Sequence, residues 1–188
     1  MQYRVLVALS LVLCTSLAFG QGEANSLKGV PAKERILVGG GLGLGFSNVQ
    51  DFVSVSPEVS YRLTARLMAG TGFSYRYTNY KYYRPSIKLH DYGVNPFLRF
   101  IVYRQIFIHT ETEVLNYEFP TSPSETVRKN FTSFLAGVGL FQPAGGRANF
   151  YIMALYNLSY QNPIPGTYSA YDSPLVIRAA FLFGDLGL

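Results

Sequence analysis

The stretch SVSPEVSYRL, at residues 54–63, alternates between two kinds of side chain. Its even-numbered positions carry serine, glutamate and arginine, whereas its odd-numbered positions carry valine, proline, tyrosine and leucine. Successive side chains of a β-strand point to opposite faces of the sheet. This alternation therefore predicts a strand with one apolar face and one polar face.

The same alternation recurs on both sides of this stretch, from residue 36 to the C-terminal end. It predicts seven further strands, at residues 36–46, 66–77, 91–102, 106–115, 132–141, 150–160 and 175–184. Lengths of about ten residues exceed the roughly 5–6 residues of a typical strand in a soluble domain, and they match a tilted membrane span.

The connections between the predicted strands alternate in length. Short ones are predicted near Thr64, near Arg104 and at residues 143–147, and long ones at residues 78–90, 118–130 and 161–174. Short turns at one end and longer loops at the other are typical of outer-membrane barrels. The sequence therefore predicts an all-β fold, an eight-stranded antiparallel up-and-down transmembrane β-barrel at residues 34–188.

Residues 1–20 have the layout of a secretory signal peptide. Arg4 supplies a positive charge, residues 5–13 form an apolar run, and residues 18–20 (AFG) place small side chains before a cleavage point. The apolar run is too short for a membrane-spanning helix. We therefore predict a cleaved signal peptide at residues 1–20 and a periplasmic tail at residues 21–33, with an uncleaved anchor as the alternative.

Charge and cysteine content narrow the classes of function. The chain has 16 basic and 11 acidic residues, and the lysines after residue 20 fall in the tail or in predicted loops rather than along a stripe. Nucleic-acid binding requires a basic patch or helix face, so we expect no nucleic-acid partner. The single cysteine, Cys14, lies in the apolar run of the signal peptide. The mature chain is therefore expected to have no disulfide and no thiolate metal ligand.

The polar faces of the predicted strands do not suit bulk water. They are rich in glycine and serine and contain no lysine, as expected for a narrow interior that side chains fill. The apolar faces carry phenylalanine and tyrosine near the strand ends, as in the aromatic girdles of membrane barrels. A soluble secreted lipid-binding barrel, whose apolar face would point inward, is the alternative.

Charged residues on the polar faces are predicted to form a network inside the barrel, because charges removed from bulk water need partners. These residues are Glu58, Arg62, Arg66, Arg76, Arg99, His109, Glu111, Glu113 and Arg178. Such a network would plug the lumen of a barrel with eight strands. A proton or ion path through the lumen is the alternative.

Four strand segments carry a resemblance to a known family. They are residues 56–64 (SPEVSYRLT), 70–75 (GTGFSY), 95–100 (NPFLRF) and 155–158 (LYNL). In these segments the chain resembles the small OmpA/OmpX-type outer-membrane β-barrels, including those of Bacteroidota-like bacteria. The resemblance implies the barrel fold and an outer-membrane location. The chain departs from the family at its end, because it finishes on Gly187-Leu188 where such barrels usually place an aromatic residue that helps assembly.

The sequence predicts no catalytic residues. His90, Asp91 and Ser86 lie close together in the sequence, so a lipid-modifying barrel enzyme that uses these loop residues is an alternative function. The chain has two histidines, His90 and His109, and its one cysteine lies in the signal peptide. We therefore expect neither a metal site nor a cofactor.

The predicted loop after the third strand concentrates tyrosine and basic residues. Its members are Tyr77, Tyr80, Lys81, Tyr82, Tyr83, Arg84 and Lys88. Tyrosine offers amphipathic contact area, and the cations suit the phosphates of lipopolysaccharide or an acidic protein. An interfacial aromatic belt with solvated charges is the alternative interpretation.

These patterns together predict a non-enzymatic integral outer-membrane protein with a structural, envelope-contact or accessory-subunit role. Its expected partners are outer-membrane lipid, lipopolysaccharide and another envelope protein. Its expected location is the bacterial outer membrane, which it would reach by export through the periplasm.

Overall fold

The computed structural model describes residues 27–122, 125–161, 169–171 and 173–187. The predicted signal peptide lies outside the described residues. The described chain begins with a turn and the 3₁₀ helix η2 (Ala32–Arg35), where the Arg35 guanidinium donates to the carbonyls of Leu27 and Val30. Within the described residues, no helix is long and apolar enough to cross a membrane.

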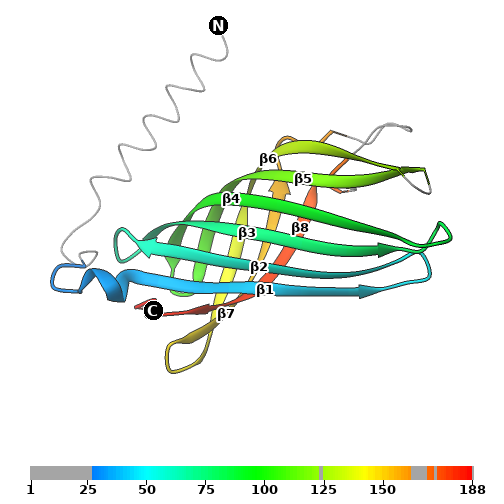
Figure 1. Ribbon diagram of the computed structural model, residues 1–188. Helices are drawn as coiled ribbons and strands as arrows, with labels where there is room; N and C mark the ends of the chain where they lie inside the picture. The colour runs from blue at the N-terminus through cyan, green and yellow to red at the C-terminus, as the bar shows by residue number, and fades with distance from the viewer. Residues whose placement is uncertain (1–26, 123–124, 162–168, 172, 188) are drawn as a thin grey trace, which may run out of the picture.

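Eight strands follow the 3₁₀ helix. They are β1 (Ile36–Phe46), β2 (Gln50–Arg62), β3 (Leu67–Tyr80), β4 (Ile87–Tyr103), β5 (Ile106–Ser122), β6 (Glu125–Gly145), β7 (Ala148–Asn157) and β8 (Leu175–Phe183). Each strand pairs antiparallel with the next, and β1 pairs with β8 to close the barrel. The predicted all-β, eight-stranded, up-and-down barrel is therefore confirmed. In Figure 1, the first and last strands bring both ends of the described chain to the same end of the barrel.

The alternation of side chains becomes an alternation of exposure. On β1, Leu37 is completely buried, whereas its neighbours Ile36 and Val38 are 47% and 55% exposed. The outward faces of β1, β2 and β7 are largely apolar, whereas their inward faces combine glycine, polar side chains and some large apolar ones. A soluble barrel with an apolar interior would show the reverse arrangement.

Two of the predicted long loops are largely strand. β3 continues to Tyr80 and β4 begins at Ile87, so only the middle of the predicted loop at residues 78–90 connects them. β5 and β6 pair almost to their tips, which makes the predicted loop at residues 118–130 a projecting hairpin. The loop predictions are wrong here because main-chain hydrogen bonds hold these strands together. Such bonds form whether or not apolar and polar side chains alternate along the strand.

Two prolines on the outward face interrupt the hydrogen-bonded ladder without shifting its register. Pro57 and Pro96 have no amide hydrogen to donate. The pairing of β2 with β3 is missing at residues 56–57, and the pairing of β4 with β5 is missing at residues 95–96. The pairs on both sides of each gap keep the same register. Each proline therefore removes pairing on one side of its strand only.

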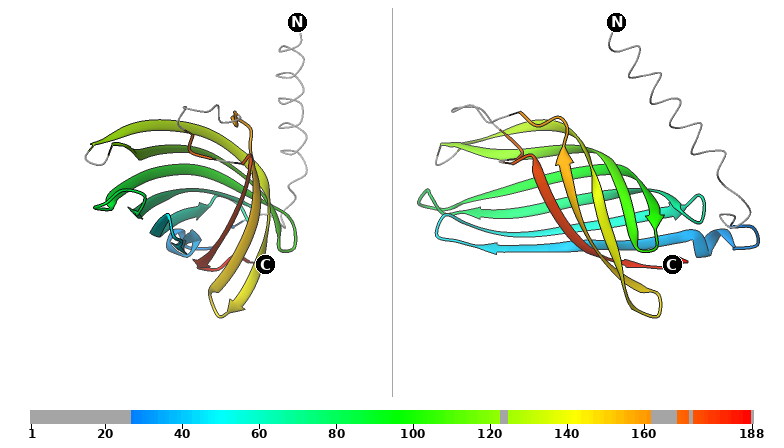
Figure 2. Two further views of the ribbon diagram at one scale, coloured as in Figure 1. Left: turned by 90° about the vertical axis from the view of Figure 1, so that its right-hand side faces the viewer. Right: turned by 180° about the vertical axis from the view of Figure 1, so that it is seen from behind.

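Strand length divides the barrel into a tall wall and a short wall. The strands β4, β5 and β6 are the longest, and β7, β8 and β1 are the shortest. Figure 2 shows β5 and β6 projecting beyond β7 and β8 at the end of the barrel away from the termini.

Candidate functional site

The end of the barrel that holds the termini is filled by apolar side chains. Leu37, Met68, Phe107, Phe141 and Leu182 are buried there almost completely. The rings of Phe107 and Phe141 have their centroids 4.4 Å apart. This apolar cluster forms the floor of the lumen.

The C-terminal segment completes the floor. Leu186 is buried within the apolar cluster, although it follows the last strand. The carbonyl of Asp185 accepts a hydrogen bond of 2.7 Å from Arg62, which lies at the end of β2. Arg62, a predicted lumen residue, therefore holds the C-terminal segment against the barrel rather than joining the other charged residues.

Arg99 lies directly above the apolar floor and is completely buried. Its guanidinium lies 3.4 Å from Glu58 and donates from Nε to His109 Nδ1 at 3.3 Å. The Tyr151 hydroxyl donates to the same Glu58 carboxylate at 2.6 Å. The guanidinium carbon also lies between 4.5 and 5.6 Å from four ring centroids, those of Tyr151, Phe97, Phe107 and Phe141. Aromatic faces attract a buried cation, so they share the stabilisation of Arg99 with Glu58.

His109 connects this layer to a second carboxylate. Because its Nδ1 accepts from Arg99, its Nε2 carries the hydrogen that points to Glu111 Oε2, 3.1 Å away. The same oxygen accepts from Asn95 Nδ2 and from Arg178 Nη1, each at 3.0 Å. Three donors on one oxygen are the arrangement that a buried carboxylate needs.

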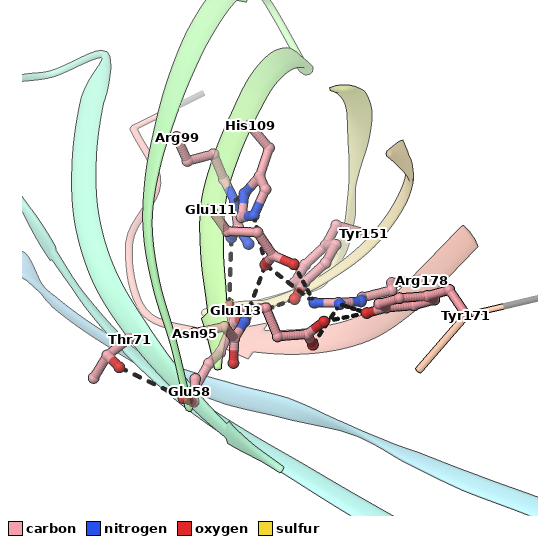
Figure 3. Close-up of polar contacts among 11 residues, drawn as sticks. Glu58, Thr71, Asn95, Arg99, His109, Glu111, Glu113, Tyr151, Tyr171 and Arg178 are labelled. Atoms are coloured by element: carbon pink, nitrogen blue, oxygen red, sulfur yellow. Dashed lines mark hydrogen bonds and ion pairs between the residues drawn. The ribbon is translucent and has the colours of Figure 1, made fainter. Parts of the chain in front are cut away.

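Arg178 on β8 bridges two carboxylates on β5. It lies 2.8 Å from Glu111 and 2.9 Å from Glu113, and Figure 3 shows both carboxylates pointing toward it. Tyr171, in the connection before β8, donates its hydroxyl to Glu113. Residues from five strands and one loop thus form a continuous polar network across the lumen.

A cavity of about 540 Å³ lies on top of this network. The network residues form its lower wall. Its remaining polar lining comes from Ser54, Ser56, Ser74, Arg76, Asp91 and Tyr117. The apolar floor and the buried Arg99 layer close it on the side of the termini. The cavity is therefore closed toward the termini and is not a through-channel. We call this cavity, with the lining given above, the vestibule.

Besides Arg62, two more predicted lumen residues lie outside the central network. Arg66 is exposed in the turn between β2 and β3, so its predicted lumen position is wrong. The turn starts earlier than the alternation indicated, and Arg66 precedes the first paired residue of β3. Arg76 faces inward in the upper part of the barrel, where its guanidinium lies 4.1 Å from the centroid of the Phe52 ring.

The residues of the predicted tyrosine-rich loop do not all lie together in the structure. Tyr80, Tyr82 and Tyr83 pack against one another in tilted and edge-to-face arrangements, with ring centroids 5.3 to 6.2 Å apart. Lys81 bonds to Asp51 at 2.7 Å and so ties the β3–β4 connection to β2. Tyr77 packs instead against the His90 ring on the outer wall of the barrel.

The other two members of the predicted loop set, Arg84 and Lys88, are exposed. Together with Tyr80, Tyr82 and Tyr83 they form a surface of aromatic rings and cations at the end of the barrel away from the termini. The geometry needed for contact with an external partner is thus present in part of the predicted set.

The structure does not bring His90, Asp91 and Ser86 together as a triad. His90 and Asp91 are neighbours in a strand, so their side chains point to opposite faces. His90 Nδ1 lies 3.0 Å from the Tyr75 hydroxyl, and Asp91 accepts from the Glu118 amide. His90 and Asp91 thus each have a partner that a triad would not use.

Sequence reasoning missed three polar residues of the network. Tyr151 and Asn95 lie on inward faces, and their alternation with apolar neighbours was a signal that could have identified them. Tyr171 lies in a loop, where no periodicity applies, and nothing in the sequence pointed to it. Among the described residues, no group of three or more histidine, cysteine, aspartate or glutamate side chains is arranged to hold a metal ion.

Comparison of the chain with protein-family models and with curated proteins finds no match to either.

Proposed function

We propose that this protein is an integral protein of the bacterial outer membrane, with a plugged lumen and a non-enzymatic structural or envelope-contact role. The observation that carries the proposal is the outer surface. Large apolar side chains are exposed on all eight strands, including Leu44, Val55, Phe73, Leu98 and Ile152. Monomeric soluble proteins rarely expose contiguous apolar patches of more than a few hundred Å².

The height of the apolar surface fits a bilayer. On β4, the outward residues from Tyr92 to Val102 are apolar or aromatic. Ten steps of about 3.3 Å along a strand tilted by about 45° span roughly 23 Å, close to the apolar band of about 25 Å on membrane barrels. Above this band, Asn116, Glu118 and Arg128 form hydrogen bonds on the outer face of the projecting hairpin. The polar groups begin where the apolar band ends.

The filled lumen supports a structural role over transport. The Arg99 layer and the apolar floor leave the vestibule closed toward the termini. An eight-stranded barrel is just wide enough for side chains to fill. Export by the N-terminal signal would deliver the chain to the periplasm, and the exposed tyrosines and cations near Tyr82 would then face outward, toward lipopolysaccharide or another envelope protein.

A positive charge placed at two different heights on the outer surface tests the proposed membrane location. We would compare Leu98→Arg, in the middle of the apolar band, with Tyr82→Arg, at the exposed tip of the β3–β4 connection. In a bilayer, Leu98→Arg is expected to lower the free energy of unfolding by about 2–4 kcal/mol, and Tyr82→Arg by less than about 1 kcal/mol. The measurement is urea-induced unfolding in lipid vesicles, read by the gel mobility of the folded barrel.

Cell fractionation completes the test. The full chain, expressed in a Gram-negative host, should be recovered in the outer-membrane fraction and should need detergent for extraction. Recovery of a folded protein from the soluble fraction, or equal stability of the two arginine variants, would contradict the proposal.

A further inference from the structure

The first and last strands of the barrel are paired over only part of their length. β1 pairs with β8 at Val38, Gly39 and Gly40 only. The same register would continue through residues 41–46 of β1 and residues 175–180 of β8, and both strands extend that far. No pairing forms there. Figures 1 and 2 show the two strands meeting near the C-terminal end and diverging from it. We call this opening, between residues 41–46 and 175–180, the seam.

A glycine marks the point where the strands diverge. Gly40 has a φ of +146°, a conformation that other residues rarely adopt. A Cβ atom there would lie 2.5 Å from the Ser56 carbonyl oxygen. β1 remains paired with β2 along its whole length. Beyond Gly40, β1 therefore follows β2 and leaves β8.

The seam connects the vestibule to the outer surface. Gly41, Leu42 and Gly43 of β1 line the vestibule, as do residues 177–180 of β8. The three atoms nearest to a Cβ atom on Gly43 would belong to Ser54 and Phe52 of β2, and none of them to β8. Gly41 and Gly43, the inward positions of β1 at the opening, therefore place no side chain in it.

The outer rims of the seam are strongly apolar. Leu42 is 84% exposed, and Leu44 and Phe46 follow it on the same face of β1. Leu175 and Ile177 are exposed on the rim formed by β8. In hydrocarbon, unpaired strand edges are tolerated only where something satisfies their backbone groups. An occupant of the seam must therefore have an apolar part that contacts the rims and a polar part that forms hydrogen bonds with the unpaired backbone groups.

The charges of the vestibule indicate the polar part of that occupant. Its wall carries four carboxylates, those of Glu58, Asp91, Glu111 and Glu113. Arg76 and Arg178 also line it, and Arg99 pairs with Glu58 from below. The carboxylates outnumber these guanidinium groups by one, so the wall has no surplus of positive charge to hold an anion. Hydroxyl and amide groups from Ser54, Ser56, Ser74 and Asn95 supply further hydrogen-bonding partners.

We propose that the seam and the vestibule bind one membrane lipid with a neutral or zwitterionic headgroup. The headgroup occupies the vestibule, whose volume lies in the range of small-molecule sites. One hydrocarbon chain leaves through the seam and lies against Leu42, Leu44 and Ile177. This inference rests on the proposed membrane location and adds a ligand site to it.

The shape of the seam favours a lipid over an added strand of a partner protein. An inserted strand needs about 4.8 Å on each side. At the narrow end, a Cβ atom on Gly41 would lie 3.0 Å from the Ala179 carbonyl oxygen and 3.6 Å from the Ala180 Cβ. The lower part of the seam is therefore too narrow for a strand. A single hydrocarbon chain of a lipid can leave farther up, where the seam widens.

The test is native mass spectrometry of the full chain, purified in mild detergent and titrated with two probes. Monopalmitoyl lysophosphatidylethanolamine is zwitterionic, and monopalmitoyl lysophosphatidylglycerol is anionic. We expect one adduct per barrel, with the zwitterionic probe binding at least about tenfold more tightly than the anionic one.

Two variants locate the binding. Ala179→Phe adds an aromatic ring to the exposed β8 rim of the seam, opposite Leu42 in the continued register, and should weaken binding of the zwitterionic probe at least about tenfold. The matched control is Ala154→Phe, on the exposed face of β7, which should leave binding unchanged. A Leu44→Cys/Ile177→Cys pair in a Cys14→Ser background places one thiol on each rim of the seam. Because the rims diverge there, the two thiols are bridged with a reducible bismaleimide rather than by a direct disulfide. Bridging should abolish the adduct, and reduction of the bridge should restore it.

The outcomes separate the two proposals. A protein that stays in the outer membrane but forms no lipid adduct overturns this inference alone, and recovery from the soluble fraction overturns the membrane proposal too. An adduct that survives Ala179→Phe places the lipid elsewhere on the outer wall and also overturns the inference. A protein adduct in place of lipid would assign the seam to a partner strand, which again contradicts it.

Discussion

The pair of Glu58 and Arg99 allows the energetic role of the lumen network to be measured. Glu58→Gln keeps an acceptor for Tyr151 but removes the carboxylate charge that faces Arg99, 3.4 Å away. At that separation two unit charges interact by about 5 kcal/mol with an effective dielectric constant of 20. Breaking one partner of a buried pair typically costs about 3–5 kcal/mol. The aromatic rings around Arg99 offset part of this loss, so we expect a value near 3 kcal/mol.

A double-mutant cycle separates the interaction from the cost of each change. Arg99→Met keeps much of the side-chain volume and leaves Glu58 buried without its cation. In Glu58→Gln/Arg99→Met no unpaired charge remains at the pair. The double variant should therefore be more stable than the sum of the single losses predicts, by at least about 2 kcal/mol. A matched control is Lys81→Met, which breaks the partly exposed pair with Asp51 and should cost less than about 1 kcal/mol.

The assay is urea-induced unfolding of the refolded barrel in lipid vesicles, followed by circular dichroism and by gel mobility. The chain has no tryptophan, so these readouts are preferred to intrinsic tryptophan fluorescence. If Glu58→Gln costs no more than Lys81→Met, or if the two lumen losses simply add, the network does not stabilise the barrel in the way argued.

Two further predictions concern the wall and the external surface. Gly137→Ala should lower the free energy of unfolding by about 1–3 kcal/mol, because its Cβ would lie 2.0 Å from the Ala154 carbonyl oxygen. Gly43→Ala should cost clearly less in the same urea titration, since its Cβ meets the rotatable Ser54 hydroxyl. Arg84→Gln/Lys88→Gln should weaken binding to lipopolysaccharide vesicles in a sedimentation assay, whereas Lys81→Gln, whose cation is paired with Asp51, should change it less. Equal binding by all three proteins would exclude the loop cations as a contact site.

The strands were predictable because one face of each strand meets the interior and the other does not. The alternation at residues 54–63 therefore located β2, and it also placed Glu58 and Arg62 on the inward face. Beyond the apolar band both faces meet polar surroundings, so the alternation disappears although the backbone pairing continues. That is why the sequence predicted a loop at residues 118–130 where β5 and β6 form a hairpin.

The network was predictable as a set of residues but not as a set of partners. Period two identifies inward residues, and Arg99, His109 and Glu111 were found in this way. Which of them meet depends on strand stagger and on loops. The Glu58–Tyr151 bond joins residues 93 positions apart, and Tyr171 reaches Glu113 from a loop without any pattern. The seam was equally hidden, because β1 and β8 both show the alternation of paired strands and only their divergence at Gly40 opens it.

In the proposed membrane location, the interior of this barrel takes over the role that an apolar core has in a soluble protein. A bilayer would give little hydrophobic gain for bringing apolar surfaces of strands together, because lipid chains are as apolar as the side chains. Register and closure must then be specified by backbone pairing and by contacts inside the lumen. The ion pairs of Arg99 and Arg178 connect β2, β4, β5 and β8, which are far apart in the sequence. A slip of one residue in any of these strands would turn a charged side chain toward lipid, at a cost of several kcal/mol. The charged lumen therefore specifies one arrangement of the strands, and this gives its charged residues a role that does not depend on conduction.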